Sequence, residues 1–296
     1  MDGVVNVNKP LGITSHDVVY RLRRILGIKK IGHTGTLDPD AAGVLPMCVG
    51  RATKLADALT ASEKQYRAEL TLGAVTDTQD KSGTVLERHE VNISENELRS
   101  AAEKFVGEIE QIPPMYSAIK IDGKKLYELA REGKTVERKP RSVTVHKIEF
   151  TKIDLENNKA EMTVDCSKGT YIRTLCNDIG AALGCGGYMS ALTRTRSGRF
   201  DIQDAYTLDE IEKMAEENDF GFLIPTGEVL SEVPKIILAE RNAWRVRNGI
   251  KITVAGLCEG ETYRVFDEHG EFLALAKQEN GKFVIVKAFY GGVLSE

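Results

Sequence analysis

The sequence contains few cysteines, and none lies in a pattern that binds zinc or builds a disulfide framework. The five cysteines among 296 residues are odd in number and include no CxxC pair. Scattered cysteines of this kind are typical of free thiols in a reducing compartment. They argue against a disulfide-rich secreted fold and against a structural zinc site, so we expect no metal.

Long apolar runs are also missing, both inside the chain and at its start. No stretch has the length and composition of a membrane span, and the first ten residues lack the apolar run of a secretory signal. We therefore expect no membrane partner and a cytoplasmic location. The 42% hydrophobic and 28% charged residues are usual for a globular protein of one large domain, with or without a small one.

The net charge of -4 gives no overall attraction to a polyanion, but the charges are unevenly distributed. Residues 120–147 include nine basic and four acidic residues, whereas residues 201–240 include two basic and eleven acidic ones. The first segment has the charge to meet phosphate groups, and the second would avoid them. A solvated charged face is the other explanation for each segment, and composition leaves both open.

Hydrophobic periodicity predicts mixed helices and strands over residues 1–232. A cap at Thr14 or Ser15 predicts a helix ending at Gly27, and Ser94 with Glu97 forms a capping box for another. Residues 73–83 are polar and predict a loop. Further helices are expected near 51–59, 126–130, 172–183 and after Thr207, and strands near 4–7, 66–72, 143–150 and 160–166.

The pattern changes beyond Pro225 and Pro234, which places a domain boundary near Glu232. A short helix near 243–247 and strands near 263–266, 272–276 and 283–288 predict a small β-rich module over residues 233–296. About sixty residues are marginal for independent folding, so we expect this module to pack on the domain of residues 1–232.

The segment from Ile31 to Pro46 is rich in glycine and proline around one short acid, Asp38. Glycines permit unusual backbone angles, and Pro39 restricts the residue before it to extended or turn geometry. We therefore predict a rigid loop that presents the Asp38 carboxylate. A structural turn, in which Asp38 only bonds nearby amides, is the alternative.

Two further residues have both a functional and a structural interpretation. Tyr66 begins an alternating strand on its apolar face, where it is either a core tyrosine or a ring that stacks on a nucleobase. Arg173 is expected in the first turn of a helix, where a cation opposes the helix dipole. Its position suggests a nearby anionic partner, although an ordinary surface arginine would also fit.

Four segments along the first domain form a set of motifs: Lys9-Pro10 with Gly12, Thr14 and Ser15; Gly32–Pro39 (GHTGTLDP); Thr76-Asp77-Thr78 with Asp80 and Gly83; and Cys166–Thr174 (CSKGTYIRT). In order and spacing this set closely resembles the bacterial TruB-type tRNA pseudouridine synthases. The tail from about Val233 resembles a PUA domain, an RNA-binding β barrel, through Arg247-Asn248-Gly249 and its later strands.

The resemblance implies an α+β fold: a mixed, largely antiparallel sheet with flanking helices, followed by the small PUA-like barrel. It also implies isomerisation of uridine to pseudouridine at position 55, in the T loop of tRNA, without a cofactor or metal. The partner is tRNA through its T arm, no obligatory protein partner is expected, and the protein is expected to be a monomer.

The resemblance further implies roles for individual residues. Asp38 falls on the catalytic aspartate, Tyr66 on the ring that stacks on the target base, and Arg173 on the arginine that pairs with the acid. His33 falls on a histidine that helps to hold flipped-out nucleotides, and Asp80 and Leu192 match other pocket positions. The basic segment 120–147 lies where the family has an insertion that closes over RNA. Its candidates for contact with the RNA backbone are Lys124, Lys125, Lys134 and Lys139.

The chemistry implied by the resemblance agrees with these residue types. The base must leave the sugar through nitrogen and rejoin it through carbon, which needs a group that stays with both fragments. An aspartate is ionised at neutral pH and can do this without a separate base, and Arg173 would orient it. Hydrolytic glycosidases use a second carboxylate to activate water, whereas here water must be excluded. Whether Asp38 attacks the sugar, attacks the base or acts first as a base stays open.

Two other functions stay open from the sequence. A guide-RNA-dependent pseudouridine synthase of the dyskerin type would share the Asp38 loop and the PUA domain but would need partner proteins. A tRNA-folding chaperone would need only to bind.

Overall fold

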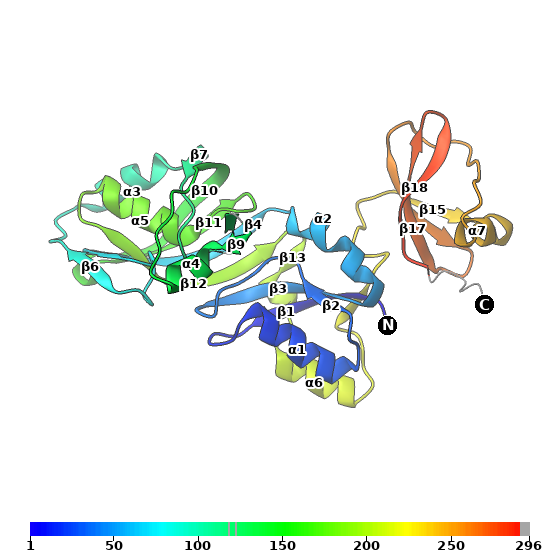
Figure 1. The fold of residues 1–296 in the computed structure, drawn as a ribbon, viewed down its shortest axis with the longest axis horizontal. Helices are drawn as coiled ribbons and strands as arrows, with labels where there is room; N and C mark the ends of the chain where they lie inside the picture. The colour runs from blue at the N-terminus through cyan, green and yellow to red at the C-terminus, as the bar shows by residue number, and fades with distance from the viewer. Residues whose placement is uncertain (118, 122, 291–296) are drawn as a thin grey trace.

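The computed structural model describes residues 1–117, 119–121 and 123–290, so parts of the predicted basic segment and of the C-terminal module lie outside the described residues. Figure 1 shows an elongated molecule, with a large sheet and its helices in the body and a smaller lobe at one end. The two family features expected above, a large α+β domain and a small β-rich module, are both present. Among the described residues, no helix is long and apolar enough to cross a membrane.

One mixed sheet forms the body, with the strand order β14-β1-β3-β12-β4-β11-β10-β7. Every neighbouring pair along this order is antiparallel except β3 with β12, as expected for a largely antiparallel sheet. Its strands are β1 (Gly3–Lys9), β3 (Ala41–Val49), β4 (Lys64–Leu72), β7 (Gly107–Gln111), β10 (Arg141–Asp154), β11 (Lys159–Cys166), β12 (Gly187–Ser197) and β14 (Leu223–Pro225), with β2 (Ile31–His33) on β3 and β13 (Phe200–Asp201) on β12.

The helices are built from the caps and apolar spacings predicted above. Thr14 caps α1 (Ser15–Leu26) in a capping box with Asp17, and Gly27 ends it in the left-handed conformation. The predicted box of Ser94 and Glu97 caps α3 (Glu95–Glu103). The remaining helices of the body are η1 (Gly50–Leu55), α2 (Ala56–Thr60), α4 (Leu126–Arg131), η2 (Leu155–Asn157), α5 (Ile172–Ala182), η3 (Ile202–Asp204) and α6 (Leu208–Glu216).

Two hydrophobic cores lie side by side along this sheet. Alternate residues of β1 and β3, such as Val5, Val7 and Leu45, pack with α1 and α6. Residues of β4, β11 and β12, such as Leu70 and Met162, pack with α3 and α5. Residues of the candidate site lie where these two cores meet.

The structure corrects two predictions. Residues 41–49 form a central strand, so the predicted Ile31–Pro46 loop is limited to residues 34–40 between β2 and β3. Gly43 has φ +102°, and a Cβ there would lie 2.2 Å from the carbonyl oxygen of Arg194 on β12, so a glycine is needed for that close pairing. The loop 73–83 includes β5 (Ala74–Thr76), which pairs with β6 (Val85–Arg88).

The C-terminal module folds around its own core, which includes Val265, Leu273 and Ala276. Its four-stranded sheet and helix are β15 (Lys235–Leu238), α7 (Glu240–Arg247), β16 (Thr262–Asp267), β17 (Phe272–Glu279) and β18 (Lys282–Ala288). The module packs on the body as expected, since Phe289 and Phe272 join a core with Val4 and Val44 of the main sheet.

Candidate active site

The loop that carries Asp38 is held at its base by the start of α1. Ser15 Oγ accepts a hydrogen bond from the backbone N–H of Leu37 at 2.8 Å and donates one to the carbonyl of Leu37 at 3.0 Å. Pro39 accepts a bond from the N–H of Gly12 at 2.9 Å. These contacts hold the residues on both sides of Asp38, as predicted for a rigid loop that presents this carboxylate.

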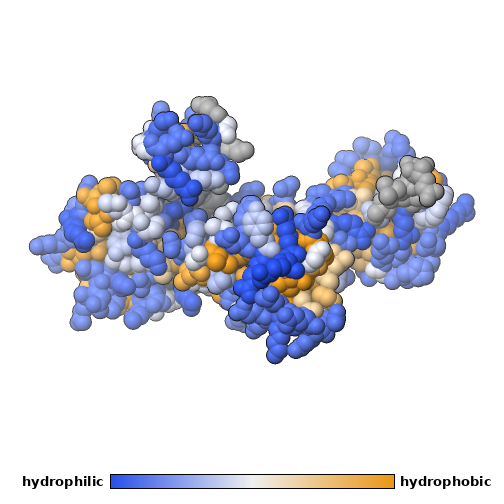
Figure 2. Space-filling view, turned by 60° about the horizontal axis from the view of Figure 1, so that its bottom comes forward, coloured by the Kyte–Doolittle hydropathy of each residue, from blue (hydrophilic) through white to orange (hydrophobic). Residues whose placement is uncertain are grey.

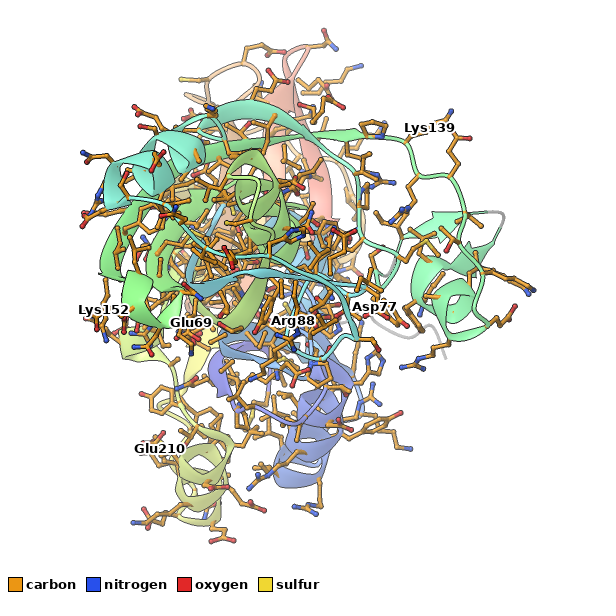
Figure 3. The ribbon with its side chains drawn as sticks, turned by 90° about the vertical axis from the view of Figure 1, so that its left-hand side faces the viewer. Glu69, Asp77, Arg88, Lys139, Lys152 and Glu210 are labelled. Atoms are coloured by element: carbon orange, nitrogen blue, oxygen red, sulfur yellow. The ribbon has the colours of Figure 1, made fainter. Side chains whose placement is uncertain are left out.

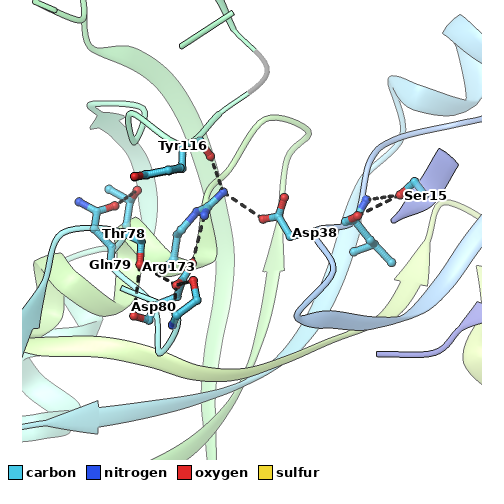
Figure 4. Close-up of polar contacts among 10 residues, drawn as sticks. Ser15, Asp38, Thr78, Gln79, Asp80, Tyr116 and Arg173 are labelled. Carbon is cyan, nitrogen blue, oxygen red and sulfur yellow. Dashed lines mark hydrogen bonds and ion pairs between the residues drawn. The ribbon is translucent and has the colours of Figure 1, made fainter. Parts of the chain in front are cut away.

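Arg173, in the first turn of α5, forms ion pairs with two aspartates from separate loops (Figure 4). Its Nη2 lies 3.0 Å from Oδ2 of Asp38, and its Nη1 lies 3.1 Å from Oδ2 of Asp80. The side chains of Arg173 and Asp80 are 9% and 12% exposed, whereas that of Asp38 is 53% exposed. Arg173 therefore has the nearby anionic partners that its place in the helix suggested, and only Asp38 is open to solvent.

A network of neutral groups fixes Arg173 and Asp80. The Tyr116 carbonyl accepts a second bond from Nη2 of Arg173 at 2.9 Å. The other carboxylate oxygen of Asp80 accepts bonds from the hydroxyls of Thr78 and Ser82 at 2.7 and 2.6 Å. These bonds offset part of the cost of desolvating the two buried charges.

Tyr66 on β4 and Leu192 on β12 lie where the two cores of the body meet. Each is partly buried and packs against both cores. Burial raises the pKa of the Tyr66 hydroxyl, while the positive charge of Arg194 acts in the opposite direction. The ring is therefore neutral at physiological pH and only partly covered, so the core and stacking interpretations of Tyr66 both fit its position.

Two buried cations, Lys9 and Arg194, support the Asp38 loop, and the sequence alone suggested no site role for either. The Lys9 ammonium donates to the carbonyls of Pro10 and Ile13 at 2.9 and 2.7 Å. Burial lowers its pKa to about 8, and the neighbouring Asp38 carboxylate partly opposes that change. Arg194 donates from Nη2 to the carbonyl of Gly35 in the loop at 3.2 Å, and from Nε to the carbonyl of Val44 on β3 at 2.7 Å. Lys9 belongs to the first motif quoted above, and that motif was the feature of the sequence that could have indicated its role in the site.

His33 ends β2 at the edge of the same loop. Its Nδ1 lies 3.4 Å from the backbone nitrogen of Gly35. Burial lowers the pKa of His33, and the nearby charges of His16 and Arg194 lower it further, so the ring is neutral at pH 7. A neutral ring beside the loop can pack against a base without the cost of burying a charge.

The basic segment projects from the body as an arm (Figures 2 and 3). The arm carries β8 (Lys120–Ile121), β9 (Lys124–Lys125) and α4. Lys139 lies on the segment that leads from the arm back to the body, across the molecule from Lys152 (Figure 3). Lys134 pairs with Glu132 at 2.7 Å, and Lys124 lies 3.8 Å from the same acid. Lys125 donates to the hydroxyl of Tyr127 at 3.2 Å. The four predicted phosphate contacts are therefore not equivalent.

The site therefore contains one solvent-facing carboxylate, that of Asp38, which buried Arg173 orients. The apolar side chains of the two cores meet nearby, at Tyr66 and Leu192. Such a carboxylate can act as a nucleophile or stabilise developing positive charge on a sugar. Within the described ranges, no group of three or more His, Cys, Asp or Glu side chains is arranged to hold a metal ion.

Family models match most of the body of this chain. Residues 23–172 match the model described as TruB family pseudouridylate synthase (N terminal domain). Residues 173–230 match the model described as tRNA pseudouridylate synthase B C-terminal domain. The join between the two models falls at Arg173, the residue that links the loops of Asp38 and Asp80.

Individual proteins are similar over nearly the whole chain. The tRNA pseudouridine synthase B of Alkaliphilus oremlandii is 52% identical over 252 residues, covering 85% of this chain and 83% of that protein. The protein of the same name from Clostridium kluyveri is 43% identical over 293 residues, covering 98% and 100%. A chain in the crystal structure of a Cbf5-Nop10-Gar1 complex matches with a TM-score of 0.72 and 28% identity, covering 97% of this chain and 85% of that chain.

Proposed function

Because the chain belongs to the TruB family of pseudouridylate synthases, we propose that it isomerises a uridine of tRNA to pseudouridine, at position 55 in the T loop. One observation carries the assignment. The exposed carboxylate of Asp38 is paired with buried Arg173, and Leu37, next to Asp38, belongs to the core against which Tyr66 packs, in a chain whose relatives are named tRNA pseudouridine synthase B.

Asp38 is the residue that we propose to act on the target nucleoside. The bond between the base nitrogen and the sugar breaks, the base turns, and a carbon of the base forms the new bond to the sugar. That carbon then loses its proton and the freed nitrogen gains one, so the product is an isomer of the substrate. Arg173 keeps the carboxylate oriented through both steps. A single acid suits this reaction, because a second carboxylate that activated water would hydrolyse the bond and leave an abasic site.

The target base must leave the folded T loop before it can reach Asp38, at a cost of a few kcal/mol. We propose that Tyr66 stacks on the extruded base and that Leu192 closes the apolar side of the pocket. One aromatic stack contributes about 1–3 kcal/mol, which offsets much of that cost. His33 and Asp80 complete the pocket. His33 would contact the nucleotides next to the target, and Asp80 would act by holding Arg173 in place.

RNA affinity would come from two other parts of the chain. We propose that the basic arm contacts the phosphate backbone through Lys124, Lys125, Lys134 and Lys139, while the shape of the T arm gives specificity. Residues 1–232 would form the catalytic domain and residues 233–296 a PUA-like RNA-binding domain. A monomer in the cytoplasm, without a cofactor or a protein partner, completes the proposal.

The structural likeness to Cbf5 favours a second candidate, a synthase that depends on partner proteins. The matching Cbf5 structure is that of a complex with Nop10 and Gar1. The higher identity of 43–52% to proteins named tRNA pseudouridine synthase B favours a chain that acts alone. Activity of the purified chain on a bare T-arm stem-loop separates these candidates.

The deciding experiment is incubation of the purified chain with unmodified tRNA, followed by mapping of pseudouridine. We expect modification at position 55 alone and none with Asp38→Asn, although that variant should still bind tRNA. Near-normal pseudouridine formation by Asp38→Asn would overturn the assignment. If Asp38→Asn preserved the cellular role in a competition-growth assay, that role would be chaperoning and not catalysis.

A further inference from the structure

A row of aromatic rings runs from the candidate site along one side of α1. The rings of His33 and His16 lie 5.8 Å apart at 73°, and those of His16 and Tyr20 lie 6.3 Å apart at 58°. The guanidinium of Arg23 lies 5.8 Å from the centre of the Tyr20 ring. Positions 16, 20 and 23 are four and then three residues apart, so their side chains share one helix face. We call these four residues the α1 row.

The α1 row has little part in holding the fold. The face of α1 that packs on the core carries Val18, Val19 and Leu22, and none of these belongs to the row. Tyr20 is 61% exposed, and His16 is exposed as well. A tyrosine ring so far out of the core contributes little to stability, and it lies next to a second exposed ring, that of His16, so the two form a patch and not a single exposed residue.

The charges around the α1 row favour an anionic partner with flat rings. Asp17, beside His16, accepts bonds from the N–H and hydroxyl of Thr14 in the helix cap. Arg21 turns the other way and pairs with Glu212 of α6 at 2.9 Å. In the part of the chain that the structure describes, no acid forms an ion pair with Arg23. Exposed Lys29 and Lys30 follow at the end of the helix.

Exposed rings interleaved with unpaired cations are the features of a surface that binds unpaired nucleotides. The bases stack on the rings, and the cations meet the phosphates. A hydrophobic protein partner would fit less well, since the row ends in Arg23, and Lys29 and Lys30 follow it at the end of the helix.

We propose that the α1 row is a stacking platform for unpaired nucleotides adjoining the target uridine. The row holds these nucleotides away from the RNA stem while Asp38 acts on the uridine. This inference rests on the proposed function, and it adds His16, Tyr20 and Arg23 to the RNA-binding surface. The row acts on binding and not on the chemical step.

The test measures the Kd of a T-arm stem-loop RNA in the Asp38→Asn background, which binds without turnover. We expect Tyr20→Ala and His16→Ala each to raise Kd by about 5-fold or more, and Tyr20→Phe to bind as the parent does, because it keeps the ring. Leu86→Ala is the matched control, since Leu86 is 63% exposed on β6 and lies outside the row. With Asp38 intact, Leu86→Ala should form pseudouridine at the wild-type rate, whereas Tyr20→Ala and His16→Ala should lower kcat/KM by about the factor by which they raise Kd.

Abasic substitutions in the RNA identify the contacting nucleotides. An abasic site at a contacted position should weaken binding to the parent but not further weaken binding to the His16→Ala/Tyr20→Ala variant. An unchanged Kd in that double variant, or an equal effect of the abasic sites on both proteins, would overturn the inference. A wild-type chain that forms no pseudouridine would instead overturn the proposed function, and the inference with it.

Discussion

The guanidinium of Arg173 joins Asp38 to Asp80, lying 3.0 Å from one carboxylate and 3.1 Å from the other. The two acids differ in their surroundings, since Asp80 is enclosed by hydroxyls and Asp38 is half exposed. Asp80 thus anchors the arginine, and the arginine orients the acid that is free to react. This division of roles makes the effect of each substitution distinct.

Asp80→Asn should lower kcat by about 10- to 100-fold, because the loss of one anchoring charge lets Arg173 and then Asp38 shift from the reactive position. Affinity for tRNA should stay within about 2-fold, since Asp80 is buried. Asp77→Asn is the matched control, because Asp77 bonds the N–H of Thr84 on the same loop. An equal loss of kcat in both variants would show a general disturbance of the loop and contradict the anchoring role.

The basic arm gives a second prediction, concerning salt. Lys139→Gln should reduce the slope of log Kd against log salt by about 1, whereas Lys134→Gln should reduce it less, because Lys134 is already paired with Glu132. Lys152→Gln removes the same charge from exposed β10, on the other side of the molecule (Figure 3). If Lys152→Gln flattened the slope as much as Lys139→Gln, the arm would lose its assigned place in the interface.

The features predicted correctly from the sequence are those set by neighbouring residues. The helix α1 is an example, since Thr14, Asp17 and Gly27 form its cap and its end without help from the rest of the chain. Asp38 was also singled out, because glycine and proline around an acid act locally. Its pairing with Arg173 was expected from the motifs of the family.

The features that the sequence did not reveal depend on contacts between distant segments. Glycine in the middle of β3 indicated a loop, but Gly43 serves the close approach of β12, which lies about 150 residues further along the chain. The contact between Arg173 and Asp80 joins residues 93 positions apart. Neither relationship has a local pattern, because each depends on how segments far apart in the sequence come together in the fold.

The buried lysine beside the site gives a prediction about pH and stability. Burial lowers the pKa of Lys9 from 10.5 to about 8 in the folded chain, so between those values the unfolded chain binds more protons. The contribution of Lys9 to the free energy of unfolding therefore rises as pH increases from about 8 to about 10.5. Lys9→Met removes this contribution, so the difference in stability, wild type minus variant, should be larger at about pH 10 than at about pH 7.

Urea unfolding at the two pH values measures that difference directly. Lys29→Met is the control for the change in net charge, because Lys29 is exposed. A difference for Lys9→Met that stayed constant, or that shrank as the pH rose, would mean that Lys9 does not carry the desolvation cost assigned to it.

The serine at the start of α1 gives the last prediction, which separates stability from positioning. Ser15→Ala leaves the buried N–H and carbonyl of Leu37 without their partner, at a cost of about 1–3 kcal/mol. Thr14→Ala removes the cap of the same helix at a cost of about 1 kcal/mol but does not touch the loop. Both variants should unfold earlier in urea, yet only Ser15→Ala should lower kcat, by about 10-fold or more, because Asp38 follows Leu37 directly. Equal kcat values in the two variants, measured where both are folded, would show that the hydrogen bonds between Ser15 and Leu37 stabilise the fold but are not needed to position the Asp38 carboxylate.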